Sequence, residues 1–213
     1  MENRICYIFG AGERSGCEIS LSPEDFVIAA DGGFDYLNDL GLRADVVLGD
    51  FDSVLSYELP SDSIRFPREK DDTDMMLAVK LGLEKGYREF AIYGGLGGRL
   101  DHTLANLQVL VYLSRNEACG TLYSDNYAIR VISDGTISFG KDHPANVEGN
   151  LCSVFSVSDV SVKVTIHGLK YEINDVNLTN SFPLGISNEF TGKKAYINVK
   201  KGTIAALWYL PRL

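Results

Sequence analysis

Aspartates with the type and spacing to hold a cation are concentrated in three short segments of the first half of the chain. Asp50 and Asp52 lie two residues apart in the segment GDFDS, Asp31 precedes two glycines, and the segment KDDTD contributes Asp71 and Asp74. Two carboxylates at one strand end repel each other, and a bound cation relieves that repulsion. Carboxylate oxygens suit Mg²⁺, which takes its remaining ligands from water and substrate phosphates. We therefore interpret these aspartates as candidates for a magnesium-phosphate site.

Each segment also has a purely structural alternative. Asp-Gly-Gly is a common turn, so Asp31 alone indicates little. Asp71 and Asp74 are spaced to cap the helix that follows and to complement its positive end. The segment GDFDS is harder to explain in this way, because a strand end gains nothing from two adjacent like charges.

A second candidate for phosphate binding is the glycine-rich turn GGLGG at residues 94–98, which includes Gly95. It leads through Arg99 and Asp101 into a predicted helix. Backbone amides at a helix start can cradle phosphate, and an arginine can clamp its oxygens. Such glycines can also serve only to permit positive φ. The early Gly10-Ala11-Gly12 lacks the third glycine of a dinucleotide fingerprint, so we exclude a nicotinamide enzyme.

Other metal and nucleophile chemistries find no support in the sequence. The three histidines are not spaced four residues apart and none adjoins a cysteine, so a zinc site is not indicated. No G-x-S-x-G nucleophile elbow occurs. The four cysteines are scattered without a C-x-x-C pair, and we interpret them as reduced thiols.

The elements that must position the aspartates alternate between buried strands and amphipathic helices. Strands are predicted at 5–9, 26–30, 44–48 and 91–93, and helices at 73–85 and about 100–116. This alternation predicts an α/β domain with a doubly wound, mostly parallel sheet. Ligands of such domains bind at the carboxyl ends of the strands, where the three aspartate segments should converge.

Beyond about residue 120 the hydrophobic period shortens to that of β-strands. Runs at 128–132, 151–157, 160–166, 195–199 and 203–208 are separated by turn signals such as Asp134-Gly135. They predict an antiparallel β-sandwich or barrel. We expect a domain boundary that gives domains 1–120 and 121–213. The stretch 174–191 does not fit a strand, and we interpret it as a long loop.

Composition and charge limit the function classes. The chain has 213 residues, 45% of them hydrophobic and a formal charge of −9, with 20 acids and 10 bases before residue 111. This acidic surface would repel nucleic acid, so we expect no nucleic-acid partner. Apolar runs are too short for a membrane span or a signal peptide, so we expect no membrane association and a cytoplasmic location.

The four motifs together resemble the thiamine pyrophosphokinases, in order and in spacing. They are DGG from Asp31, GDFDS at 49–53, KDDTD at 70–74 and GGLGGRLDH at 94–102. The late segment GISNEF at 185–190 and the strand containing Trp208 are similar to the family's thiamine-contacting part. The resemblance covers essentially the whole chain.

This resemblance implies an enzyme that transfers the pyrophosphoryl group of ATP to the hydroxyl of thiamine, giving thiamine diphosphate and AMP. It implies Mg²⁺ as cofactor and a homodimer with the active site between subunits. The residues it implies are Asp50, Asp52, Asp71 and Asp74 for catalysis, of which Asp50, Asp52 and Asp74 bind metal; Asp31, Gly32, Gly95, Arg99 and Asp101 for the nucleotide; and Ser187, Asn188 and Trp208 for thiamine. Asp72 and His102 depart slightly from the family pattern.

Two other hypotheses remain open from the sequence. A related magnesium-dependent pyrophosphokinase acting on a pterin or a nucleotide would use the same carboxylates. A non-catalytic sensor of nucleotide or thiamine would bind without turnover. Product analysis with candidate acceptors separates all three.

Overall fold

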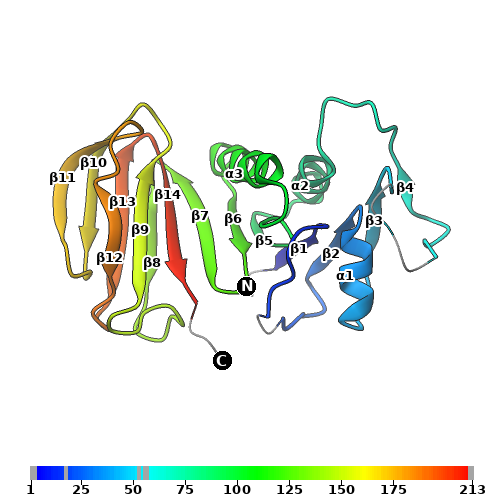
Figure 1. Cartoon of the computed structure of the whole chain (residues 1–213), viewed down its shortest axis with the longest axis horizontal. Helices are drawn as coiled ribbons and strands as arrows, with labels where there is room; N and C mark the ends of the chain where they lie inside the picture. Colours follow the sequence, from blue (N-terminus) through cyan, green and yellow to red (C-terminus); the bar gives the residue numbers. More distant parts are fainter. Residues whose placement is uncertain (1–3, 17–18, 52–53, 55–57, 211–213) are drawn as a thin grey trace. The chain divides into compact units, whose positions relative to one another are not determined.

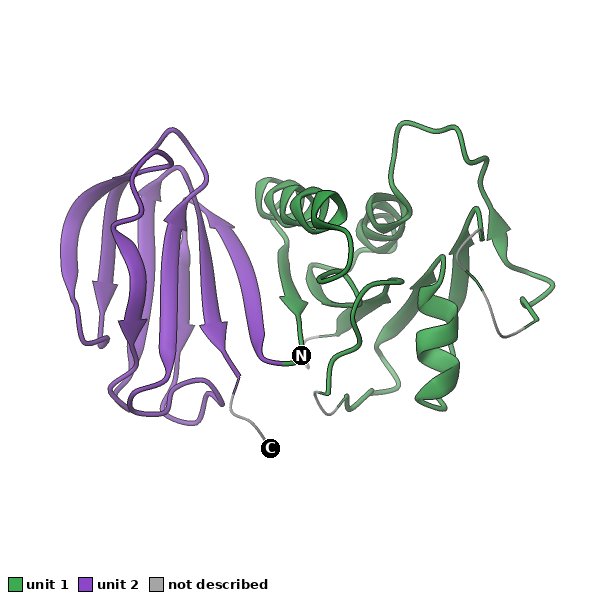
Figure 2. Cartoon of the chain, viewed as in Figure 1, with its two compact units in different colours: residues 1–125 green, residues 126–213 purple. Residues whose placement is uncertain are grey.

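The chain folds into two compact units, residues 1–125 and 126–213 (Figure 2). The computed structural model describes residues 4–16, 19–51, 54 and 58–210. The expected boundary after residue 120 falls inside strand β6 (Cys119–Tyr123), which pairs with β5 (Glu89–Tyr93) in the first unit. None of the helices described in the structure is long and apolar enough to cross a membrane.

The first unit is built on a parallel sheet, as the buried apolar runs predicted. Its other strands are β1 (Ile5–Phe9), β2 (Phe26–Ala30), β3 (Val46–Gly49) and the short β4 (Ile64–Arg65). The order is β6-β5-β1-β2-β3-β4, and neighbouring strands are parallel. The chain runs outward in one direction through β2 and β3 and in the other through β5 and β6. The strand order therefore reverses between β1 and β5, where ligands bind in sheets of this kind.

Helices cover both faces of this sheet (Figure 1). On one face α1 (Gly33–Asp39) contributes Tyr36 and Leu37 to a core that includes Phe9. On the other, α2 (Asp74–Glu84) packs so closely that a Cβ atom on its Gly82 would overlap Phe90 of β5. The third helix, α3 (Leu100–Arg115), packs closely on β6. The doubly wound fold is thus confirmed, and α1 extends the Asp-Gly-Gly turn into a helix that the sequence did not predict.

Two glycines bring the ends of β1 and β5 into direct backbone contact. Gly10 donates its N–H to Tyr93 O at 2.8 Å, and Gly12 donates to Gly94 O at 2.7 Å. A Cβ atom on Gly94, whose φ is +63°, would overlap the carbonyl oxygen of Gly10. The early glycines, which we set aside as a fingerprint, are required here for close packing of two loops.

The second unit is a sandwich of two antiparallel sheets. One sheet has the order β12-β9-β14-β7 and the other β11-β10-β13-β8. The strands are β7 (Tyr127–Ser133), β8 (Thr136–Phe139), β9 (Leu151–Ser156), β10 (Val160–His167), β11 (Ile173–Thr179), β12 (Gly185–Glu189), β13 (Ala195–Lys201) and β14 (Thr203–Tyr209). Phe139 of one sheet packs edge-on against Trp208 of the other, with ring centroids 5.3 Å apart.

Our interpretation of residues 174–191 as a loop is wrong. The segment contains most of β11 and all of β12, which are edge strands of the two sheets. Both pair with register shifts, and each has only one buried residue, Leu178 in β11 and Asn188 in β12. A bulged, solvent-facing edge strand loses the regular alternation of apolar residues on which strand prediction depends.

Among the cysteines that the structure describes, Cys6 and Cys152 are buried and form no disulfide. Burial raises the pKa of Cys152 to about 12 and raises that of Cys6 well above its ordinary value. A thiol that stays protonated is a poor nucleophile and a poor metal ligand. Both cysteines therefore serve as packing residues.

The contact between Gly10 and Gly94 can be tested with a matched pair of glycines from one loop. Gly94→Ala should cost about 3 kcal/mol or more of unfolding free energy, because the new methyl group overlaps backbone. Gly98→Ala should cost only about 1 kcal/mol, since its φ is also positive, at +61°, but nothing lies within 4 Å of a Cβ there. Urea unfolding of both variants measures the difference, and equal losses would contradict a steric role for Gly94.

Candidate active site

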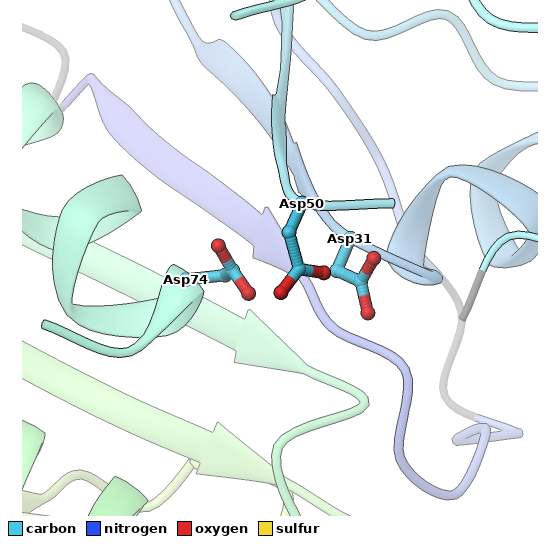
Figure 3. A group of neighbouring side chains, drawn as sticks. All are labelled: Asp31, Asp50 and Asp74. Atoms are coloured by element: carbon cyan, nitrogen blue, oxygen red, sulfur yellow. The ribbon is translucent and has the colours of Figure 1, made fainter. Parts of the chain in front are cut away.

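Three aspartates converge at the carboxyl edge of the parallel sheet. Asp31 follows β2, Asp50 follows β3 and Asp74 is the first residue of α2. Each offers a carboxylate oxygen, and these oxygens lie within 4.8 Å of one another. Figure 3 shows the three side chains next to one another, with Asp50 between Asp74 and Asp31. The sequence placed these residues at one rim, and the structure brings them into one cluster.

The backbone leading to this cluster turns sharply at both strand ends. Asp31 has a φ of +52°, which is uncommon for a residue with a side chain, and its N–H donates to Leu48 O at 2.8 Å. Gly49, with a φ of +149°, lies against the backbone of Asp31. The two strand ends are therefore fixed to each other, and they set the separation between Asp31 and Asp50.

The loop before α2 shows which of its polar residues caps the helix. Thr73 is the N-cap, and its side chain accepts a hydrogen bond from Met76 N at 3.1 Å. The alternative that Asp71 and Asp74 form the cap is thus wrong. Asp72 is paired with Lys80 at 2.6 Å. Because Thr73 provides the cap, the carboxylate of Asp74 is left to the cluster.

Lys70 brings a positive charge into contact with the cluster. Its Nζ lies 3.0 Å from Asp74 Oδ1 and 3.8 Å from Asp50 Oδ2. Burial raises the pKa of Asp74 above its ordinary value, and Asp50 and Asp31 add to that increase, whereas Lys70 opposes it. In the chain without metal, the ionised cluster is therefore held at an electrostatic cost that Lys70 only partly offsets.

The donor set fits a hard divalent cation. All three residues offer oxygen, the preferred ligand of Mg²⁺ and Mn²⁺. Oδ1 of Asp31 is buried, and no hydrogen bond reaches it from the described part of the chain. A buried acceptor of this kind is costly unless something binds it, so a cation would satisfy an otherwise unmet requirement.

The cluster opens into a cavity of about 830 Å³ that is large enough for a nucleotide. Asp71, Asp72 and Gly32 line it together with the cluster, and so does the predicted phosphate turn with Gly95 and Arg99. Basic groups also reach the cavity, namely Arg14, Arg68 and Lys70. The site therefore offers carboxylates for a cation and guanidinium and ammonium groups for phosphate.

Arg99 is held by a neighbouring acid in the structure. Its guanidinium donates two hydrogen bonds to Asp101, at 2.6 and 3.1 Å, and both side chains are exposed. This pairing lowers the pKa of Asp101 to about 2. Asp101 is not among the residues lining the cavity, so its contribution to nucleotide binding would act through Arg99.

The three residues expected on the thiamine side all belong to the second unit, and they differ in exposure. Ser187 is exposed and has a φ of +57°. Asn188 is buried, and its side chain binds the backbone of Tyr171, accepting from N at 2.9 Å and donating to O at 2.7 Å. Trp208 is only 4% exposed and packs in the sandwich core. Direct contact of these residues with a substrate stays a prediction.

Asp52, the remaining metal candidate, lies outside the described residues. Sequence reasoning missed several cavity residues: Gly10, Gly12, Arg14, Arg68, Lys70 and Asn106. The signal available for the two glycines was their place after a predicted strand. For Asn106, which donates to Gly95 O at 2.6 Å from inside α3, no sequence signal existed.

Fold and site together define a class: an α/β unit with a carboxylate-lined cavity at its topological switch point, followed by an antiparallel sandwich. Comparison with known families gives two matches in the same order. Residues 18–121 match the model described as thiamin pyrophosphokinase, catalytic domain, and residues 136–204 match thiamin pyrophosphokinase, vitamin B1 binding domain. The chain belongs to the thiamin pyrophosphokinase family.

Individual relatives agree with this assignment. The chain is 29% identical to the thiamine pyrophosphokinase of Bacillus subtilis over 184 residues, covering 83% of this chain and 84% of the relative. The crystal structure of a Bacillus subtilis thiamine pyrophosphokinase superposes with a TM-score of 0.84 at 26% identity, covering 97% of this chain and 99% of the other. The Geobacillus thermodenitrificans structure shares the fold, with a TM-score of 0.81 at 24% identity and coverage of 97% and 98%.

Cation binding by the cluster can be measured by thermal unfolding with and without MgCl₂. At about one hundred times the dissociation constant, Mg²⁺ should raise the Tm of the wild-type protein by about 5 °C. Asp50→Asn and Asp74→Asn should lose most of this increase. Asp72→Asn makes the same change two residues before Asp74 but removes a carboxylate already paired with Lys80, and it should keep the increase. An equal Mg²⁺ response in all four proteins would exclude the cluster as the cation site.

Proposed function

We propose that this protein is a thiamine diphosphokinase, which transfers the pyrophosphoryl group of ATP to the hydroxyl of thiamine and releases AMP. The observation that carries the proposal is the cluster of Asp31, Asp50 and Asp74 in a nucleotide-sized cavity, in a chain of this family. The catalytic-domain match includes this cluster, and the vitamin B1 domain match supports thiamine as the acceptor.

We assign the cation, as Mg²⁺, to Asp31, Asp50, Asp74 and Asp52. When bound, it would neutralise part of the triphosphate charge and help to orient the phosphates. Asp31 was expected among the nucleotide-binding residues, and its unsatisfied Oδ1 favours the cation instead. Asp71 lines the same cavity, and we assign it the role of orienting water or phosphate there.

The phosphate chain of ATP would lie between the carboxylates and the basic side chains. The backbone of the turn at 94–98 and the side chains of Arg99, Arg68 and Lys70 line this part of the cavity. Pyrophosphoryl transfer requires mainly that the reacting groups be held in line and that charge be stabilised, with little covalent participation by protein. A rim of fixed backbone with mixed charges meets those requirements.

The acceptor side is assigned to the second unit. A negative cluster suits thiamine, because its thiazolium ring carries a permanent positive charge. Ser187 is exposed for a direct contact, whereas Asn188 would act by fixing the backbone of Tyr171, a residue that is 58% exposed. The proposal includes a homodimer in which this surface completes the site of the other subunit, and a cytoplasmic location.

The identity of the nucleotide product tests the reaction type. Incubation with ATP, Mg²⁺ and thiamine should give AMP and thiamine diphosphate in equal amounts, because the β-phosphorus is attacked. Anion-exchange chromatography of the products, with pterin and nucleoside acceptors as parallel controls, measures this. Stoichiometric ADP would show an ordinary kinase, and tight binding without any product would show a sensor.

Complementation tests the shared site. Ser187→Arg should block the acceptor side and Asp74→Asn the cation side, so each variant alone should be inactive. Refolded together in equal amounts they should recover about one quarter of wild-type activity, since half of the dimers are mixed and each mixed dimer has one intact site. Differently tagged chains report mixed dimers by pull-down. Mixed dimers without recovered activity would show that each subunit builds its site alone.

A further inference from the structure

The ammonium group of Lys70 lies against two of the three carboxylates of the cluster. Its Nζ contacts carboxylate oxygens of Asp74, at 3.0 Å, and of Asp50, at 3.8 Å, and donates to Pro67 O at 3.2 Å. Its side chain is only 14% exposed, and those of Asp50 and Asp74 are 16% and 22% exposed. This ion pair is therefore shielded from solvent much better than an ordinary surface pair.

Other basic groups near the cavity are engaged differently. Lys80 pairs with Asp72 outside the cluster, with its side chain 39% exposed. Arg99 pairs with Asp101, with its side chain 71% exposed. Lys70 contacts two of the three carboxylates that the cation needs. An ammonium group and a divalent cation cannot both occupy the space between these oxygens, because like charges so close repel strongly.

We propose that Lys70 is the resident counter-cation of the metal-free site, that the divalent cation displaces its ammonium group, and that this group then pairs with the phosphates of the nucleotide. The inference rests on the proposed function and adds a role for a residue outside the expected site. A lysine suits exchange of this kind, because its compact charge sits on a flexible stem and makes no planar, two-pronged contacts.

The displaced ammonium group would remain within the same cavity. Lys70 belongs to the irregular segment between β4 and α2, and its neighbours Asp71 to Asp74 line the cavity with it. The phosphate turn with Gly95 and Arg99 lines the same space. When the ammonium group of Lys70 leaves the carboxylates, it would therefore lie next to the phosphate-binding groups. The negative charge of the phosphates would then compensate its positive charge.

If this exchange occurs, removing the charge of Lys70 should have opposite effects on two affinities, that for the cation and that for the nucleotide. In the metal-free protein Lys70 competes with the cation, so removing its charge should strengthen cation binding in the absence of nucleotide. With nucleotide bound, the lost ammonium group should weaken the hold on phosphate. A lysine with a merely structural role would, when replaced, leave cation binding unchanged or weaken it, because the cluster would be less well formed.

The test compares Lys70→Met with Lys80→Met, which removes the same charge from a pair outside the cluster. Mn²⁺ is the probe, since it shares the oxygen preference of Mg²⁺ and the free ion is counted directly by electron paramagnetic resonance. Without nucleotide, Lys70→Met should bind Mn²⁺ about three- to tenfold more tightly than wild type. Lys80→Met should stay close to wild type, and the charge-conserving Lys70→Arg should not bind Mn²⁺ more tightly than wild type. Under turnover, Lys70→Met should raise the KM for ATP by at least about threefold.

Each result decides between exchange and a structural role. Unchanged or weaker Mn²⁺ binding by a folded Lys70→Met protein overturns the proposal, and tighter binding with an unchanged KM overturns the transfer to phosphate. If Lys70→Met does not fold, Lys70→Gln is neutral, can still donate to Pro67 O, and carries the same expectations. Failure of the proposed function would appear in the wild-type protein as absent turnover, whereas failure of this inference would appear in the variants of an active enzyme.

Discussion

The mutual repulsion of three carboxylates within 4.8 Å is the constraint that the rest of the first unit satisfies. Nothing in the individual side chains favours this arrangement, so the scaffold must impose it. Parallel strands do so by ending at one edge, and the left-handed backbone of Asp31 against Gly49 fixes the spacing. Lys70 and the positive end of α2 offset part of the cost. Because a bound cation would remove this repulsion, carboxylates that the scaffold already holds close together favour cation binding.

The convergence of Asp31, Asp50 and Asp74 could be predicted from the sequence because it depends on two strand ends and one helix start. Buried runs such as 5–9 and 26–30 mark parallel strands directly, and a residue following such a strand must lie at the carboxyl edge. The role of Lys70 could not be predicted in this way. Its contacts depend on the path of an irregular loop, and no periodic pattern reports such a path. The same holds for Asn106, which reaches Gly95 from a helix interior.

Prediction in the second unit succeeded for strands such as β14 and failed for the edge strands β11 and β12, for one physical reason. A central strand such as β14 is covered on both sides by partners, so its apolar residues are numerous and mark it clearly. Edge strands β11 and β12 keep their strand pairing, but each buries only one residue and pairs with a shifted register. The hydrogen bonds that define such strands are made by the backbone, and the backbone leaves little trace in residue type. Asn188, within β12, also binds the backbone of Tyr171 through its side-chain amide.

This difference explains why the sequence identified the phosphate end of the reaction more readily than its acceptor. Binding a cation and a triphosphate requires a small set of charged residues and glycines at strand ends, and those residue types have few other reasons to occur there together. Recognising an organic acceptor requires shape, which many combinations of ordinary side chains provide. Ser187, Tyr171 and Trp208 are unremarkable as residue types and acquire meaning only from the surface or core in which they lie. For this chain the spacing of charged residues and glycines therefore predicts the cation and phosphate site, whereas recognition of the acceptor depends on how ordinary side chains pack.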